Sequence, residues 1–160
     1  ILAAVPLFEP RKLNLGKSGN SYLICWIGSL LVELVAHVCI VFTALSMAVP
    51  VMQVITICMG LFFAVIGNFM GKVRSNYHFG IRTPWTLESE YSWHKTHRFS
   101  GWFLVFTGLA IVVAGLSNNG YMIVGTILSG TIGLVLTTLI YSYLMWKRDP
   151  DRLKNQQKDA

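Results

Sequence analysis

Charged residues are scarce in this chain, and two long intervals contain almost none. Asp, Glu, Lys and Arg make up only 12% of the 160 residues, whereas hydrophobic residues make up 54%. Residues 99–146 hold no charged side chain, and between Lys17 and Lys72 the only one is Glu33. A far larger soluble domain would be needed to bury stretches this apolar. The sequence therefore excludes an ordinary water-soluble domain.

Cysteine and the common catalytic patterns are also poorly represented. The chain has no Gly-rich phosphate loop, and no Ser or Cys stands in a pattern that pairs it with a base. All three cysteines fall inside the apolar intervals, where they are expected to pack as small apolar side chains: Cys25, Cys39 and Cys58. We therefore expect neither enzymatic activity, nor a cofactor, nor a bound metal.

The apolar intervals are long enough to hold two helical spans each, because a bilayer core requires about 20 residues per helix. Uncharged turn formers divide both intervals, at residues 46–50 and 117–120. The sequence thus predicts an all-α fold, a polytopic membrane helix bundle. Its four predicted transmembrane helices cover residues 22–47, 50–71, 100–117 and 121–146.

The basic residues alternate along the chain with the predicted spans. Three Lys/Arg precede the first span, five lie between the second and third, five follow the fourth, and the two turns have none. Because cytoplasmic loops carry the excess of Lys and Arg, the basic segments are predicted to be cytoplasmic. The net charge of +6 then reflects topology and anionic membrane lipids, and it gives no support for direct nucleic-acid binding.

Three regions follow from this topology. Residues 1–21 are expected to form the end of a preceding span plus a basic cytoplasmic linker. Residues 22–146 form the four-span membrane domain, with a central cytoplasmic segment at residues 72–100. Residues 147–160 form a polar, solvated cytoplasmic tail.

An intramembrane polar pair stands out in the first predicted span. Glu33 and His37 are four residues apart and share one helix face. An ionisable residue at membrane depth is costly, so it indicates either a functional group or a polar contact that holds helices together. Both interpretations stay open at this point.

The central segment reads as a loop followed by a helix. Gly80 can adopt a positive φ, and Thr83 followed by Pro84 is typical of a helix N-cap and first helical residue. A helix is predicted from Pro84 through Ser100 into the third span. Arg82 is expected to anchor the loop, because its planar guanidinium can bind several carbonyl oxygens.

The same helix suggests a metal site as an alternative. Glu90, His94 and His97 are spaced so that they share a face with Gly101. The order differs from the His-Glu-x-x-His pattern of metalloproteases, and a charged helix face near lipid headgroups explains the same residues.

Small residues recur along the last two predicted spans and indicate close helix packing. The third span has them at seven-residue intervals, and the fourth has a looser group: Gly101, Gly108 and Gly115, then Gly125, Ser129, Gly130, Gly133 and Thr137.

The central segment resembles the signature of the SdpI family, bacterial membrane proteins named for an immunity protein against a secreted killing peptide. Similarity extends over essentially the whole chain, and its core is Gly80-Ile81-Arg82-Thr83-Pro84-Trp85. The resemblance assigns a structural or signalling role to the motif residues Asn76, Tyr77, Gly80, Arg82, Thr83, Pro84, Trp85, Glu90, Trp93, Thr96, His97 and Arg98. Ser75 departs from the family pattern, in which proline is common at this position.

The resemblance implies a protein of the bacterial cytoplasmic membrane that protects against an exported antibacterial peptide. Its implied partners are the secreted peptide toxin and a cytoplasmic transcriptional repressor held at the membrane. Two other functions are weighed against this one. One is a small proton-coupled transporter that uses Glu33 and His37, and the other is a metal-dependent enzyme built on Glu90, His94 and His97.

Overall fold

The structure, a computed structural model, describes residues 19–77 and 79–158. These residues form helices and no β-strand, which confirms the predicted all-α fold. The helices are α3 (Gly19–Ala44), α4 (Val51–Met70), α5 (Pro84–Glu88), α6 (Glu90–Leu116), α7 (Gly120–Lys147) and α8 (Pro150–Lys158). Four of them, α3, α4, α6 and α7, are long and apolar enough to cross a membrane. Residues 1–18, with the predicted linker, lie outside the described residues.

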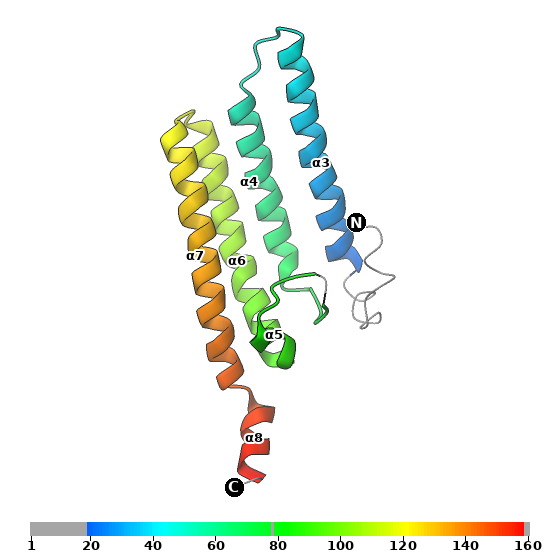
Figure 1. Ribbon diagram of the computed structural model, residues 1–160, viewed down its shortest axis with the longest axis vertical. Helices are drawn as coiled ribbons and strands as arrows, with labels where there is room; N and C mark the ends of the chain where they lie inside the picture. Colours follow the sequence, from blue (N-terminus) through cyan, green and yellow to red (C-terminus); the bar gives the residue numbers. More distant parts are fainter. Residues whose placement is uncertain (1–18, 78, 159–160) are drawn as a thin grey trace.

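The four long helices stand side by side as a row. Figure 1 shows α7, α6, α4 and α3 in that order across the molecule, and extensive contacts join α7 to α6, α6 to α4, and α4 to α3. The α4–α6 contact is the largest of the three. Because α3 packs mainly against α4, it is the least enclosed of the spans.

Glycines allow α4 and α6 to approach closely. A methyl group added to Gly101 would lie 2.6 Å from the carbonyl oxygen of Gly67, and one added to Gly108 would lie 2.5 Å from that of Gly60. Gly115 similarly faces the Thr56 side chain. The small residues at seven-residue intervals therefore do form a packing face, as predicted, and α4 supplies matching glycines.

The small residues of α7 divide into two groups. Gly130 contacts the Thr107 side chain, and a methyl group on Gly133 would lie 3.1 Å from Phe103. In contrast, Gly125 has no atom within 4 Å of the position that a side chain would take, and Ser129 is exposed. The predicted packing face on this helix is thus correct for its central glycines and wrong for Gly125 and Ser129.

The two turns lie at one end of the row, and the described basic segments lie at the other. Figure 1 shows the α3–α4 and α6–α7 turns at the top, with α5 and α8 at the bottom. Ser46 and Asn118 make the turns through positive φ angles of 60° and 52°. Asn119 caps α7, since its side-chain oxygen accepts the Tyr121 and Met122 amides.

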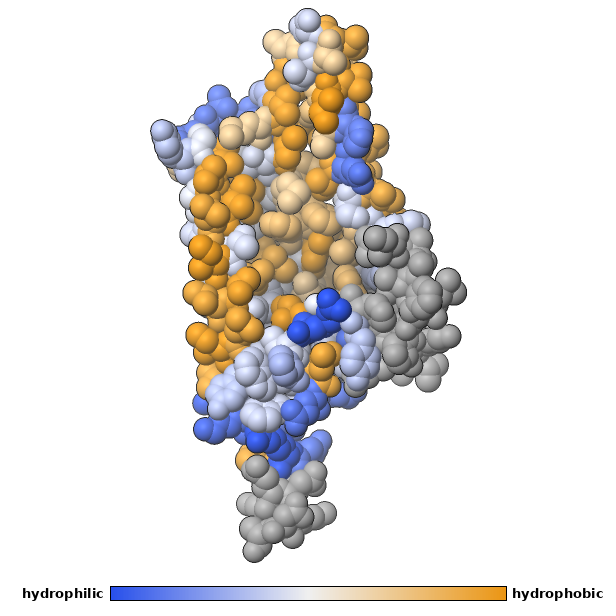
Figure 2. All heavy atoms as spheres, in the orientation of Figure 1, coloured by the Kyte–Doolittle hydropathy of each residue, from blue (hydrophilic) through white to orange (hydrophobic). Residues whose placement is uncertain are grey.

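The surface of the row is apolar along its length. Figure 2 shows mostly hydrophobic side chains over the visible helices, with hydrophilic ones gathered around the end that carries α5 and α8 and smaller hydrophilic groups at the α6–α7 turn and on the outer side of α3. Leu34, Phe106 and Val113 illustrate this pattern, because each is a large apolar side chain left more than half exposed. Lipid tails are the natural environment for such a surface.

The polar segment after the last span begins as a helix. Asp149 accepts the Asp151 amide at 3.0 Å, and α8 begins at Pro150. Arg152 then stacks over the Trp146 ring at 3.5 Å from its centroid. The tail therefore starts as a helix attached to the end of α7.

Candidate functional site

The connecting segment, residues 71–89 between α4 and α6, forms a folded cap on the basic end. Val73 joins this segment to a buried cluster with Met70 of α4 and with Trp93 and Leu104 of α6, of which Trp93 is completely buried. The Trp93 indole N–H donates to the Val73 carbonyl at 2.8 Å. An indole is well suited to this place, because it fills apolar volume and satisfies a main-chain oxygen.

Asn76 shapes the first part of the connecting segment. It is completely buried, and its side-chain NH2 group donates to the Arg74 carbonyl at 2.9 Å. Its side-chain oxygen accepts the main-chain N–H of Phe79 at 2.6 Å. Main-chain groups in a loop lack the regular partners of a helix or strand. An asparagine side chain that hydrogen-bonds to nearby main-chain groups supplies such partners. Phe79 then meets Tyr22 of α3 edge to face, with ring centroids 6.0 Å apart.

His97 fastens the loop to α6. Its Nε2 accepts the Ile81 amide at 2.9 Å, and its Nδ1 lies 2.9 Å from the Trp93 carbonyl. A carbonyl can only accept and an amide can only donate, so these partners assign the neutral ring with its proton on Nδ1. The ring stacks on Trp93 at a centroid distance of 4.1 Å. Both nitrogens are therefore used by the fold.

Gly80 is required next to that ring. Its φ is +109°, which confirms the predicted positive φ. A methyl group at this position would collide with the His97 Nε2 atom. Only glycine combines this backbone angle with the missing side chain. The Gly80–His97 contact links two parts of the chain that are 17 residues apart in the sequence.

Arg82 and Tyr77 lie on the outer side of the loop. The Arg82 guanidinium donates from Nη1 to the Tyr77 carbonyl at 2.7 Å, and both residues are exposed. The prediction that Arg82 anchors the loop through a carbonyl is confirmed for this one oxygen.

The predicted cap at Thr83 and Pro84 is confirmed. The Thr83 hydroxyl accepts the Thr86 amide at 3.2 Å, and the Thr86 hydroxyl accepts the Thr83 amide at 2.9 Å. Each threonine thus satisfies the other's main-chain donor. The Thr83 hydroxyl also donates to Ser142 Oγ of α7 at 3.1 Å. Trp85 meets Tyr143 of α7 edge to face, at 5.4 Å.

The prediction of one continuous helix from Pro84 through Ser100 is wrong. α5 ends at Glu88, and Ser89 adopts an extended conformation with φ −122° and ψ 118°. Its hydroxyl accepts the Ser92 amide, which starts a new helix at Glu90, and donates to Asp149 at 2.5 Å. Asp149 is 60 residues away. Sequence patterns cannot detect this partner, because it is brought close only by the tertiary fold.

Hydroxyl side chains fill the contact between α6 and α7. Ser92 donates to the Ser142 carbonyl at 2.8 Å, and Thr96 and Ser100 continue the same face of α6. The last two are completely buried, and their hydroxyls have no hydrogen-bond partner among the described residues. Sequence reasoning singled out only Thr96, although the spacing of Ser89, Ser92, Thr96 and Ser100 at three to four residues indicated a shared face.

The residues considered for a metal do not converge. Glu90 is exposed, His94 lies 3.5 Å from the Arg74 guanidinium, and His97 points at the loop. Among the described residues no three His, Cys, Asp or Glu side chains form a group that could hold an ion.

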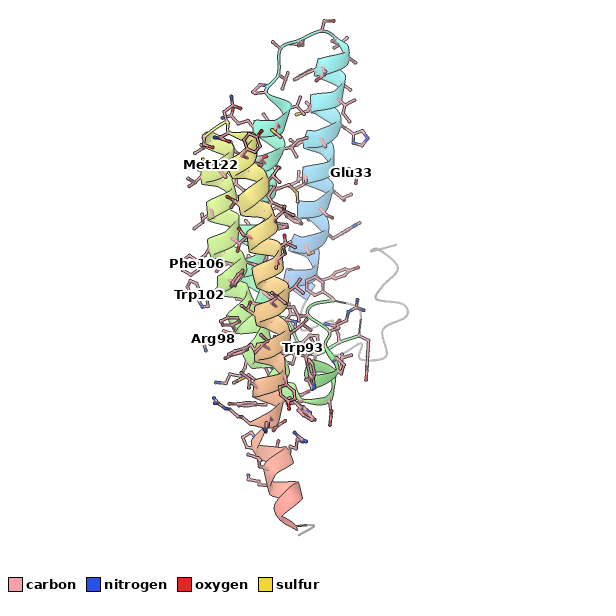
Figure 3. All side chains as sticks on the ribbon, turned by 60° about the vertical axis from the view of Figure 1, so that its left-hand side comes forward. Glu33, Trp93, Arg98, Trp102, Phe106 and Met122 are labelled. Atoms are coloured by element: carbon pink, nitrogen blue, oxygen red, sulfur yellow. The ribbon has the colours of Figure 1, made fainter. Side chains whose placement is uncertain are left out.

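Glu33 and His37 lie on the exposed side of α3. Figure 3 shows Glu33 projecting away from the other helices. His37 Nδ1 lies 3.0 Å from the main-chain oxygen of Glu33, so the predicted i, i+4 contact exists but does not use the carboxylate. The pair is remote from the connecting segment, and nothing in the described geometry favours a proton-coupled transporter.

Comparison with known proteins gives two matches. The model of the SdpI/YfhL protein family matches residues 72–145. Immunity protein SdpI of Bacillus subtilis (strain 168) is 33% identical over 105 residues, which cover 66% of this chain and 50% of that protein. The chain thus spans about half the length of this curated relative. No solved structure matches the chain.

The matched region includes most of the hydrogen-bonded unit described above, although Asp149, which accepts from Ser89, lies outside it. Residues 72–145 contain Asn76, Gly80, Thr83, Trp93 and His97, together with their partners on α6 and α7. Through these residues the chain is similar to the SdpI/YfhL protein family.

Proposed function

We propose that this protein is a membrane-embedded immunity protein, which protects its cell from an exported antibacterial peptide without catalysing a reaction. The observation that carries this proposal is the 33% identity to Immunity protein SdpI over 105 residues. The site supports it, because five of the side chains that sequence reasoning selected are used for internal hydrogen bonds that hold the cap in place: Asn76, Arg82, Thr83, Trp93 and His97.

The proposal assigns different tasks to the two ends of the row. The uncharged turns and the exposed faces beside them meet the toxin from outside. Tyr121 is suited to such contact, because it stands beside the α6–α7 turn and is 94% exposed. Residues 72–100 and the tail at 147–160 lie in the cytoplasm, where they form the surface that holds a transcriptional repressor at the membrane.

A survival assay tests the immunity function. The full natural protein, expressed in a strain sensitive to the killing peptide, is expected to raise survival well above that of the empty vector. Tyr121→Ser should weaken protection at an unchanged protein level, whereas Tyr91→Ser, at the opposite end, should not. Absence of protection by intact protein that is present in the membrane would contradict the immunity function, and full protection by Tyr121→Ser would contradict the contact at this turn.

A labelling experiment tests the orientation. Tyr121→Cys and Leu153→Cys place single reactive positions at opposite ends, on side chains that are 94% and 47% exposed. A membrane-impermeant maleimide is expected to label Tyr121→Cys in intact cells, and Leu153→Cys only after permeabilisation. The parent protein controls for the native cysteines. The reverse pattern would show that the basic end faces outward.

A further inference from the structure

A groove runs between α4 and α6 at the basic end of the row. It has a volume of about 440 Å³, within the range of small-molecule sites. Its floor is formed by the glycines that let the two helices approach closely. The residues that line it are Ala64, Gly67, Asn68, Gly71, Lys72, Arg98, Gly101, Trp102 and Val105.

Cations from both helices stand at the mouth of this groove. Lys72 follows the end of α4, and Arg98 faces it from α6. A second hollow of about 460 Å³ shares Lys72 and adds Arg74 and His94. Neither hollow is lined by an acidic residue. Lys72 Nζ lies 4.8 Å from the centroid of the Phe69 ring, which leaves its positive charge in place. Lys72 and Arg98 therefore bring two positive charges to a groove without a carboxylate in its lining.

An aromatic row continues from the cations toward the centre of the span. Arg98, Trp102 and Phe106 follow one another at four-residue intervals, and Figure 3 shows all three projecting from the same side of α6. Trp102 and Phe106 are 61% and 64% exposed. A cation followed by tryptophan and then phenylalanine matches the order of environments in a bilayer, from headgroup to interface to hydrocarbon.

We propose that this groove binds one anionic phospholipid. The phosphate lies between Lys72 and Arg98, and one acyl chain lies along Gly67, Gly101 and Val105 beside the Trp102 ring. Charge complementarity selects an anionic headgroup, and the apolar length of the groove selects a lipid over free phosphate. Basic pockets between transmembrane helices bind anionic headgroups in the same way. This site is separate from the proposed toxin contact and does not depend on it.

Native mass spectrometry of the purified full chain tests the proposal, with phosphatidylglycerol and phosphatidylcholine of identical acyl chains as probes. Phosphatidylglycerol is expected to bind with an affinity on the order of tenfold higher than phosphatidylcholine, and millimolar inorganic phosphate should not displace it. Equal affinity for the two lipids, displacement by phosphate, or a co-purified peptide in place of lipid would each overturn the proposal.

Two variants localise the site. Lys72→Gln combined with Arg98→Gln is expected to abolish the preference for phosphatidylglycerol. Its matched control is Lys95→Gln combined with Lys147→Gln, which removes the same charge from exposed positions at the same end outside the groove. An equal loss in the control pair would show that binding depends only on general surface charge, which contradicts the proposal.

Gly71→Leu supplies an independent test. Gly71 lines both hollows, has ordinary helical backbone angles, and a methyl group there would lie 3.7 Å from the nearest atom, in normal contact. A leucine can therefore fill the groove mouth without separating the helices. It is expected to lower phosphatidylglycerol affinity on the order of tenfold with unchanged helical content and elution volume. Unchanged affinity in this folded variant would overturn the proposal.

Discussion

Gly108→Leu is expected to destabilise the protein by about 3 kcal/mol, the upper part of the range for overpacking a close contact. Gly108 lies at the crossing of α4 and α6, where an added methyl group would come within 2.5 Å of the Gly60 oxygen and 2.6 Å of the Ala64 nitrogen. Both obstacles are main-chain atoms, so no side chain can rotate out of the way. The helices must separate and lose their largest contact.

Thermal unfolding in detergent, followed by far-UV circular dichroism and by the fraction of monodisperse protein, measures this effect. Gly125→Leu is the matched control, because it introduces the same side chain into a neighbouring span where nothing lies within 4 Å. The control should unfold at the temperature of the parent protein. Equal stability of the two variants would show that α4 and α6 are not held at this distance.

Gly80→Ala is expected to destabilise the basic end by about 3 kcal/mol, through two separate costs. A non-glycine residue at a positive φ costs about 1–3 kcal/mol, and Gly80 has φ +109°. The new methyl group also displaces the His97 ring, which leaves the Ile81 amide without its acceptor. A buried donor that loses its acceptor costs a further ~1–3 kcal/mol.

A double-mutant cycle with His97→Ala separates the two costs. Once the ring is absent, Gly80→Ala should retain only its backbone strain, so the double variant should lose less stability than the sum of the single variants. Gly120→Ala is the control, since that glycine has open space around it and no positive φ. Strict additivity in the cycle would contradict a direct Gly80–His97 contact.

The turn and cap signals of the central segment were largely readable in advance, because each depends on neighbouring residues. Thr83 and Pro84 start α5 as predicted, and Gly80 has its positive φ. The break at Ser89 was missed, since the apolar and polar pattern continues through it. Ser89 ends α5 and starts α6, and its hydroxyl also donates to Asp149, which lies 60 residues later in the sequence.

The histidines show the same limit more clearly. Helical spacing placed His94 and His97 near each other, and this spacing was compatible with a metal site. In the fold the two side chains diverge, His94 toward Arg74 and His97 toward the Ile81 amide. Spacing along one helix defines which residues share a face, but the partner on the other side of that face comes from a different part of the chain.

The sequence by itself determined the number of spans, their alternating direction and the turn and cap residues of the connecting segment. Each of these follows from local quantities: the length of an apolar run, the position of basic residues and the identity of turn residues. Only the tertiary structure decided that the helices form a row, that Gly60 and Gly67 match Gly108 and Gly101, and that Lys72 and Arg98 line the same groove. The reason is that contacts between two helices depend on where the helices cross and on how each is rotated about its axis. Side-chain packing between the helices sets both quantities, so neither can be read from one helix alone.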